Sequence, residues 1–285
     1  MSLSVLTLVR NRTDHLVNLL EGVARSAVQP DEVVVVDMSD TPVRLAGQHP
    51  LVRFERLETD GLPLAQARNH AAACAKGERL VFLDVDCIPM RDCLGMLSNA
   101  IGAHDRLVCA EVRYLGPGDA SGAWDEATLL AKGAVHPVRP FPAEGLEQVD
   151  SPGLFWSLAF AIRRSTFQRI GGFDERFTGY GAEDTDFGFS ARDAGLPLCF
   201  LGGALACHQY HPTFDPPLQH LDDIVANARR FHDKRGFWPM AGWLEQFAAR
   251  GLVAWQGDTL NILRQPTQRE RDQALSLWPA GGTAL

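Results

Sequence analysis

The sequence lacks several features that would assign a class of protein at once. No apolar run approaches the roughly 18 residues of a membrane-spanning helix, so we expect no transmembrane segment, while peripheral membrane contact stays open. Positive charge is scarce: 27 lysines and arginines against 35 aspartates and glutamates give a net charge of −8, which argues against a nucleic-acid partner. Met1 leads directly into an apolar segment without a basic, cleavable leader, and we therefore expect a cytoplasmic protein.

Cysteine pairs of the kind that bind metals or form redox motifs are also missing. No Cys-x-x-Cys spacing occurs, and most cysteines lie in apolar segments, so we expect reduced core residues in place of disulfides. Cys207 beside His208 would be half of a zinc site, but no second pair of suitable spacing accompanies it. The six cysteines are Cys74, Cys87, Cys93, Cys109, Cys199 and Cys207.

A glycine-rich phosphate loop is absent as well. No Gly-x-Gly-x-x-Gly follows the first predicted strand, and no glycine loop ends in Lys-Ser or Lys-Thr. The sequence therefore argues against dinucleotide binding and P-loop nucleotide binding. It also argues against a sugar nucleotidyltransferase, because that enzyme needs a basic glycine-rich loop after the first strand.

The patterning that is present predicts an α/β fold of the Rossmann type. Strands at Ser4–Val9 and Val33–Val36 flank an amphipathic helix that we expect Asp14 to cap, which makes a βαβ unit with parallel strands. A strand at Val52–Arg56 and an alanine-rich helix at Leu64–Ala75 follow. This part of the chain predicts a mostly parallel sheet flanked by helices.

Two carboxylates follow the fourth predicted strand, which begins at Leu80. Asp84 and Asp86 are two residues apart, so in an extended chain their side chains project the same way beyond the carboxyl end of the strand. Converging carboxylates repel one another unless a cation joins them, which favours a divalent metal site. The alternative is that both residues only begin a loop or cap the next helix.

A second acidic cluster follows a glycine-rich stretch in 171–181. Glu183, Asp184 and Asp186 lie at the start of a predicted helix, where they either serve chemistry or only satisfy the helix amino terminus. His208 and His211 follow the next predicted strands, at a place where a single histidine is more often structural.

The remaining segments give a domain prediction. We expect a catalytic domain over 1–211, with a donor half of about 1–115 and an acceptor half of about 150–211, and a helical extension over 212–285 packed on it. The Gly- and Pro-rich segment 116–148 is predicted to be a loop, either partly structured or a lid.

Taken in order, five motifs resemble family 2 glycosyltransferases of GT-A fold over roughly residues 3 to 211. The later motif is similar to the carboxy-terminal signature of β-1,4-galactosyltransferases and bacterial chondroitin polymerases, although Tyr180 stands where galactosyltransferases have Trp. The motifs are the amino-terminal strand-helix-strand ending in Val36-Asp37, Gln66-Ala67-Arg68-Asn69, Asp84-Val85-Asp86, Gly172-Phe173-Asp174-Glu175 together with Gly179 to Asp186, and Ala206-Cys207-His208-Gln209.

The resemblance implies a role for particular residues. Asp86 and His208 would bind Mn²⁺ or Mg²⁺, Asp84 would contact the ribose or a metal-bound water, and Asp184 would be the general base. Uracil and ribose of a UDP-sugar would be held by Thr7, Arg10, Asp37 and Arg68. Glu183 would bond a sugar hydroxyl, and Trp156 would stack on a sugar ring unless it is a core aromatic.

The predicted function is an inverting, metal-dependent glycosyltransferase that moves a sugar, with galactose or N-acetylhexosamine favoured, from a UDP-sugar to a glycan or other hydroxyl acceptor. The alternatives are a non-catalytic nucleotide-sugar-binding module and a transferase that uses a GDP- or dTDP-sugar. An Asp-x-Asp phosphatase is disfavoured because its motif ends the first strand, whereas Asp84 and Asp86 follow the fourth.

Overall fold

A ten-stranded mixed sheet forms the centre of the protein in a computed structural model that describes residues 2–47, 50–102 and 104–276. The strand order is β3-β2-β1-β4-β9-β6-β10-β5, with β7 beside β6 and β8 beside β10. Strands β3, β2, β1 and β4 are parallel, as expected, whereas β9 runs antiparallel to both of its neighbours. The strands are β1 (Leu3–Val9), β2 (Glu32–Asp37), β3 (Val52–Arg56), β4 (Arg79–Leu83), β5 (Cys87–Pro89), β6 (Leu107–Tyr114), β7 (Ala134–Val135), β8 (Gly145–Val149), β9 (Ala159–Arg163) and β10 (Leu198–His208).

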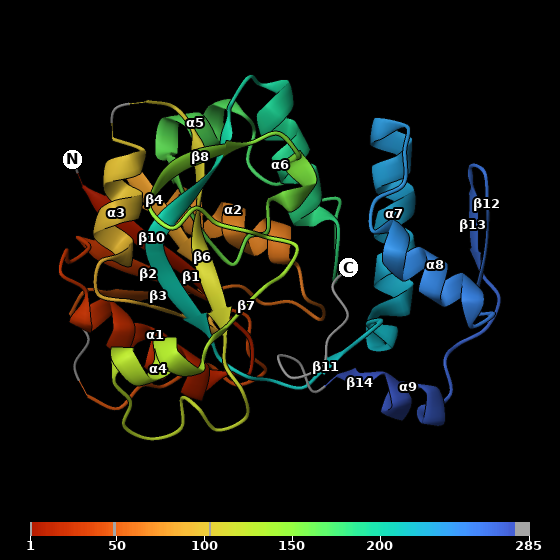
Figure 1. Cartoon of the computed structure of the whole chain (residues 1–285), viewed down its shortest axis with the longest axis horizontal. Coiled ribbons are helices and arrows are strands. Elements are labelled where there is room, and N and C mark those ends of the chain that lie inside the picture. Colours follow the sequence, from red (N-terminus) through yellow and green to blue (C-terminus); the bar gives the residue numbers. More distant parts are fainter. Residues whose placement is uncertain (1, 48–49, 103, 277–285) are drawn as a thin grey trace.

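Helices cover both faces of the sheet (Figure 1). Apolar side chains of α1 and α3 form one core with the inward face of β1 and β4, while those of α2, α5 and α6 form a second core on the other face. Because successive strand residues alternate between faces, β1 contributes Val5 to the first core and Leu6 to the second. The helices here are α1 (Thr13–Arg25), α2 (Leu64–Cys74), α3 (Cys93–Ala100), α4 (Glu126–Lys132), α5 (Arg164–Arg169) and α6 (Glu183–Asp193), with a 3₁₀ turn at Pro152–Leu154.

One local prediction, the cap of α1, needs correction. Arg12, not Asp14, occupies the cap position of α1, and Asp14 lies in the first helical turn, where its charge still suits the helix dipole. The segment 116–148 is partly structured: Asp125 caps α4 by accepting a hydrogen bond from the Thr128 amide at 2.9 Å, and β8 pairs with β10. All six cysteines are free, and five of them are buried.

The chain beyond 211 forms a smaller layer beside α6, at the right of Figure 1. It has its own apolar cluster, which includes Leu221, Ile224, Leu244 and Phe247. Besides the expected helices, this part contains two pairs of short strands; residues 277–285 lie outside the described residues. The elements are β11 (Thr213–Phe214), a 3₁₀ turn at Leu218–His220, α7 (Leu221–Arg235), α8 (Ala241–Ala249), β12 (Val253–Gln256), β13 (Thr259–Ile262), α9 (Gln268–Ala274) and β14 (Leu275–Ser276).

Within the described ranges, none of the helices is both long and apolar enough to cross a membrane.

Candidate active site

Asp86 meets two histidines at the end of β10. β5 pairs antiparallel with β10 and sets Cys87 opposite His208, so the residue before Cys87 comes next to that imidazole. Asp86 Oδ1 lies 3.4 Å from His208 Nε2, and Asp86 Oδ2 lies 3.4 Å from His211 Nε2. One ligand atom from each of the three residues lies within 4.8 Å of the others. The backbone fixes this arrangement, because the Gln209 amide donates to the Asp86 carbonyl at 2.7 Å.

The charges around Asp86 favour its ionised form. Burial alone would raise the pKa of Asp86, but His208, a hydrogen bond from His211 and the Arg12 guanidinium, 2.7 Å away, outweigh it and hold the pKa well below its usual range. Burial lowers the pKa of His208, although the charge of Asp86 opposes the fall. One carboxylate and two imidazoles form a donor set that fits Mn²⁺ better than Mg²⁺.

His211 and Arg12 were not among the predicted site residues. The sequence did carry a signal for His211, because it is a second imidazole only three residues after His208, just beyond the end of β10. Arg12 follows β1 and gives no such signal, since its approach to Asp86 spans 74 residues of sequence.

A buried arginine joins the two acidic motifs. Arg68, on α2, is 3% exposed and donates to Asp84 Oδ1 and to Glu183 Oε1, at 3.1 Å each. Its guanidinium also lies 5.3 Å from the centre of the Phe173 ring. Burial raises the pKa of Asp84 to about 6, although Arg68 opposes the rise. Arg68 and Glu183 are therefore paired with each other in this structure.

Asp184 is the second residue of α6 and lies next to this network. Burial, followed by the charge of Glu183, raises its pKa to about 7, while Arg68 and the backbone amides of Thr185 and Ser157 act in the opposite direction. A carboxylate that titrates near neutral pH is suited to accept a proton from a hydroxyl group. Asp186, from the same cluster, points elsewhere and forms ion pairs with Lys234 and Arg235 of α7.

The loop before α6 is held by the carboxy-terminal layer. Ala182 has a φ of 70°, a left-handed conformation that is uncommon for a residue with a side chain. Gly179 is also left-handed, and a Cβ there would collide with the Asp223 carboxylate of α7. The buried Asn227 amide group of α7 donates to the Thr178 and Gly181 carbonyls at 2.8 and 2.9 Å. α7 thus fixes the backbone of the loop that precedes Asp184.

Three of the residues expected to hold uracil and ribose lie on or directly after the paired strands β1 and β2. Asp37, at the end of β2, accepts from the backbone amides of Ser39 and Val43, both at 2.8 Å, and so orders the following loop. Arg10 lies 3.5 Å from Asp40 of that loop. Thr7 is 1% exposed inside β1, and among described residues its Oγ1 has no hydrogen-bond partner.

Trp156 ends a row of aromatic rings that starts at the histidine cluster. The ring of His208 lies 5.1 Å from Tyr114, Tyr114 lies 5.7 Å from His136, and His136 packs edge-on against Trp156 at 4.8 Å. The Arg139 guanidinium lies over the ring of Trp156, 4.8 Å from its centre. Trp156 is half-buried, and neither Tyr114 nor His136 was predicted from the sequence.

The sheet order and the acidic strand ends define the GT-A class of glycosyltransferase folds. The chain is similar to the crystal structure of GalNAc-T7 with UDP, GalNAc and Mn²⁺, with a TM-score of 0.56 and 18% identity over 87% of this chain and 57% of that one. It is also similar to residues 1–349 of TarS from S. aureus, with a TM-score of 0.55 and 17% identity over 81% of this chain and 66% of that one. These likenesses establish the fold.

The family follows from the sequence. Residues 4–171 match glycosyl transferase family 2, and residues 149–212 match the family described as the N-terminal domain of galactosyltransferase. The chain belongs to glycosyl transferase family 2.

Two curated relatives come from Streptomyces hygroscopicus. Validoxylamine A glucosyltransferase of subspecies limoneus is 27% identical over 69% of this chain and 49% of its own length. The protein of the same name from subspecies jinggangensis is 27% identical over 69% of this chain and 52% of its own length. The chain thus spans about half the length of these relatives.

Proposed function

We propose that the protein transfers a hexose or N-acetylhexosamine from a UDP-sugar to a hydroxyl acceptor, with inversion at the anomeric carbon and with Mn²⁺ as cofactor. The observation that carries the proposal is the pair of sites on neighbouring elements: a metal-binding donor set at Asp86, and a carboxylate of raised pKa at Asp184. Arg68 connects the two through Asp84 and Glu183.

Asp86, His208 and His211 would hold the metal ion. When bound there, a divalent cation neutralises the charge that develops on the departing diphosphate. Arg12 adds a second positive charge beside Asp86, and this favours an anionic donor. Asp84, half-exposed and fixed by Arg68, would meet the ribose or a metal-bound water.

Asp184 would act as the base. Its carboxylate accepts the proton of the acceptor hydroxyl while that oxygen bonds to the anomeric carbon, and the bond from that carbon to the diphosphate oxygen breaks on the opposite face. A single displacement of this kind inverts the anomeric configuration. Glu183 is too firmly paired with Arg68 to share the proton, so its proposed role is to keep the guanidinium in place for Asp84.

The proposed donor sugars are supported by the second family match and by the names of the curated relatives. The galactosyltransferase motif favours galactose or N-acetylhexosamine, and the names of the curated relatives add glucose. The acceptor side is proposed to lie near Tyr180, whose ring stacks on His220 at 4.4 Å between ring centres. Aromatic faces of this kind suit the apolar face of a sugar.

The test is UDP release from UDP-glucose, UDP-galactose, UDP-N-acetylglucosamine and UDP-N-acetylgalactosamine, with Mn²⁺ or with EDTA. We expect release with Mn²⁺ only, and loss of release in Asp86→Ala and Asp184→Asn, with UDP binding retained in Asp184→Asn. Asp193→Asn is the matched control, because it makes the same change at the exposed end of the same helix. Release that persists in EDTA or in Asp184→Asn contradicts the mechanism, and activity with GDP- or dTDP-sugars alone contradicts the donor.

A further inference from the structure

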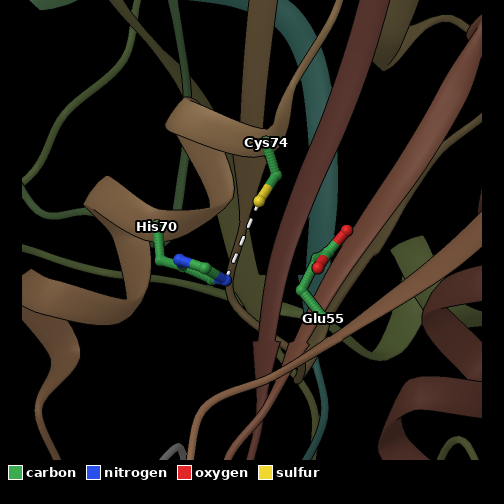
Figure 2. Close-up of side chains that lie close together, drawn as sticks. All are labelled: Glu55, His70 and Cys74. Carbon is green, nitrogen blue, oxygen red and sulfur yellow. Dashed lines mark hydrogen bonds between the residues drawn. The ribbon is translucent and has the colours of Figure 1, made fainter.

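Three metal-binding side chains of different chemistry meet at the edge of the sheet. Glu55 belongs to the edge strand β3 and stands opposite Val36 of β2, on the face that α2 covers. His70 and Cys74 lie one turn apart on α2, so both project from the same side of the helix. Figure 2 shows the two helical side chains reaching toward the strand that carries Glu55.

The distances suit a tetrahedral metal ion. His70 Nε2 and Cys74 Sγ are 3.7 Å apart, close to the roughly 3.5 Å that tetrahedral zinc–nitrogen and zinc–sulfur bonds impose. One ligand atom from each of the three residues lies within 4.8 Å of the others, so small rotations of the Glu55 side chain complete the set. All three residues are half-buried, which leaves an open side for a water molecule as fourth ligand.

The surroundings hold the carboxylate in place. Arg53, on the same strand, bonds Glu55 through Oε1, and its other nitrogen donates to the Cys74 carbonyl at 2.7 Å and to Glu32 at 3.1 Å. A metal-binding carboxylate is usually hydrogen-bonded by such an outer group, which orients it. Arg53 therefore links the strand ligand to the end of the helix that carries Cys74.

The ligand types select the metal. A thiolate, an imidazole and a carboxylate favour Zn²⁺, whereas Mg²⁺ and Ca²⁺ prefer oxygen ligands alone. We propose that Glu55, His70 and Cys74 form a zinc site that fastens β3 to α2, separate from the Asp86 cluster. Because α2 also carries Arg68, bound zinc would stabilise the helix that joins the two acidic motifs.

Co²⁺ titration of the whole protein tests this site, since cobalt replaces zinc and gives a charge-transfer absorption when it bonds a thiolate. The titration is run on Asp86→Asn, so that the other cluster does not take up the ion. We expect a cobalt–thiolate band with a dissociation constant in the micromolar range or tighter, which one equivalent of Zn²⁺ removes. The band should disappear in Cys74→Ala and weaken at least about tenfold in affinity in Glu55→Gln and His70→Gln.

Cys109→Ala is the matched control, because Cys109 is a buried thiol that the proposed site does not use. Circular dichroism confirms the fold of each variant, and His70→Gln serves if Cys74→Ala does not fold. Absence of the band in folded protein overturns the proposal. So does a band that survives in Cys74→Ala, because another cysteine would then be the ligand.

Discussion

Asn227 offers the sharpest test of how the carboxy-terminal layer serves the active site. Its side chain is completely buried, and Nδ2 donates to the carbonyls of Thr178, Gly181 and Tyr180 at 2.8, 2.9 and 3.4 Å. Its Oδ1 accepts from Arg230 at 2.9 Å. The change Asn227→Ala removes all of these bonds and leaves the carbonyls of the loop before α6 without this donor.

The cost can be worked out from the geometry. The two short bonds contribute about 1 kcal/mol each, and leaving buried carbonyls unpaired adds a desolvation penalty, so we expect a loss of about 3 kcal/mol in the free energy of unfolding. For a chain of this size that corresponds to a fall of roughly 6 °C in Tm. Asn227→Asp keeps the shape of the side chain but places a carboxylate oxygen opposite the carbonyl oxygens of the loop. We expect this variant to lose at least as much free energy of unfolding near neutral pH.

Urea unfolding and steady-state kinetics measure the two consequences together. We expect kcat to fall about tenfold because the loop that leads into Asp184 is no longer fixed, with the KM for the donor little changed. Asn261→Ala is the control, since it removes one exposed bond from Arg229 and should stay within about 0.5 kcal/mol of the parent. If Asn227→Ala also stays within that range, α7 does not hold the loop and the reasoning is refuted.

Further predictions concern charge, metal and chain length. Because Asp184 must be ionised to act as base and its pKa is raised to about 7, kcat should rise with pH through about 7 and then level off; a kcat that is level across neutral pH contradicts this. Arg68→Met should lower the free energy of unfolding by about 3 kcal/mol and move the rise in kcat to higher pH, because Arg68 lowers the pKa of Asp184; an unmoved pH profile would oppose it. His211→Ala should raise the Mn²⁺ concentration for half-maximal activity by about tenfold or more, and an unchanged Mn²⁺ requirement would remove it from the ligand set. A chain that ends at 211 should lose stability and activity, because the loop before α6 loses its hydrogen bonds from Asn227 and Asp186 loses its ion pairs with α7; unchanged stability and kcat would show otherwise.

Much of the fold could be predicted because its signals are local. The spacing of Leu16, Leu19 and Val23 predicts the buried face of α1, and all three are buried. The four valines of β2 predict a strand, and the structure places them alternately in the two cores on either side of the sheet. Patterns of this kind need no knowledge of distant residues.

The parts that were missed depend on tertiary contacts. Arg12 reaches Asp86 across 74 residues, and Asn227 reaches Gly181 across 46, so no spacing within a segment reveals either. Thr7 stays a prediction: it was expected to hold the uracil or ribose, and in β1 it is 1% exposed, with an Oγ1 that has no hydrogen-bond partner among the described residues. Which face a strand residue takes depends on pairing that the sequence alone leaves open.

The contacts of α7 explain why residues 212–276 belong with the active site. Asp186 is 1% exposed, and a carboxylate buried to this degree is tolerated only when opposite charges join it. Both of its partners, Lys234 and Arg235, come from the last turn of α7. The first turn of that helix places the Asp223 carboxylate against Gly179, where it accepts a hydrogen bond from the Tyr180 amide. α7 therefore holds both the helix that begins at Glu183 and the loop before it. We therefore propose that the boundary near 211 marks a change in composition but not a break between independent units, and that the base Asp184 is positioned by both layers.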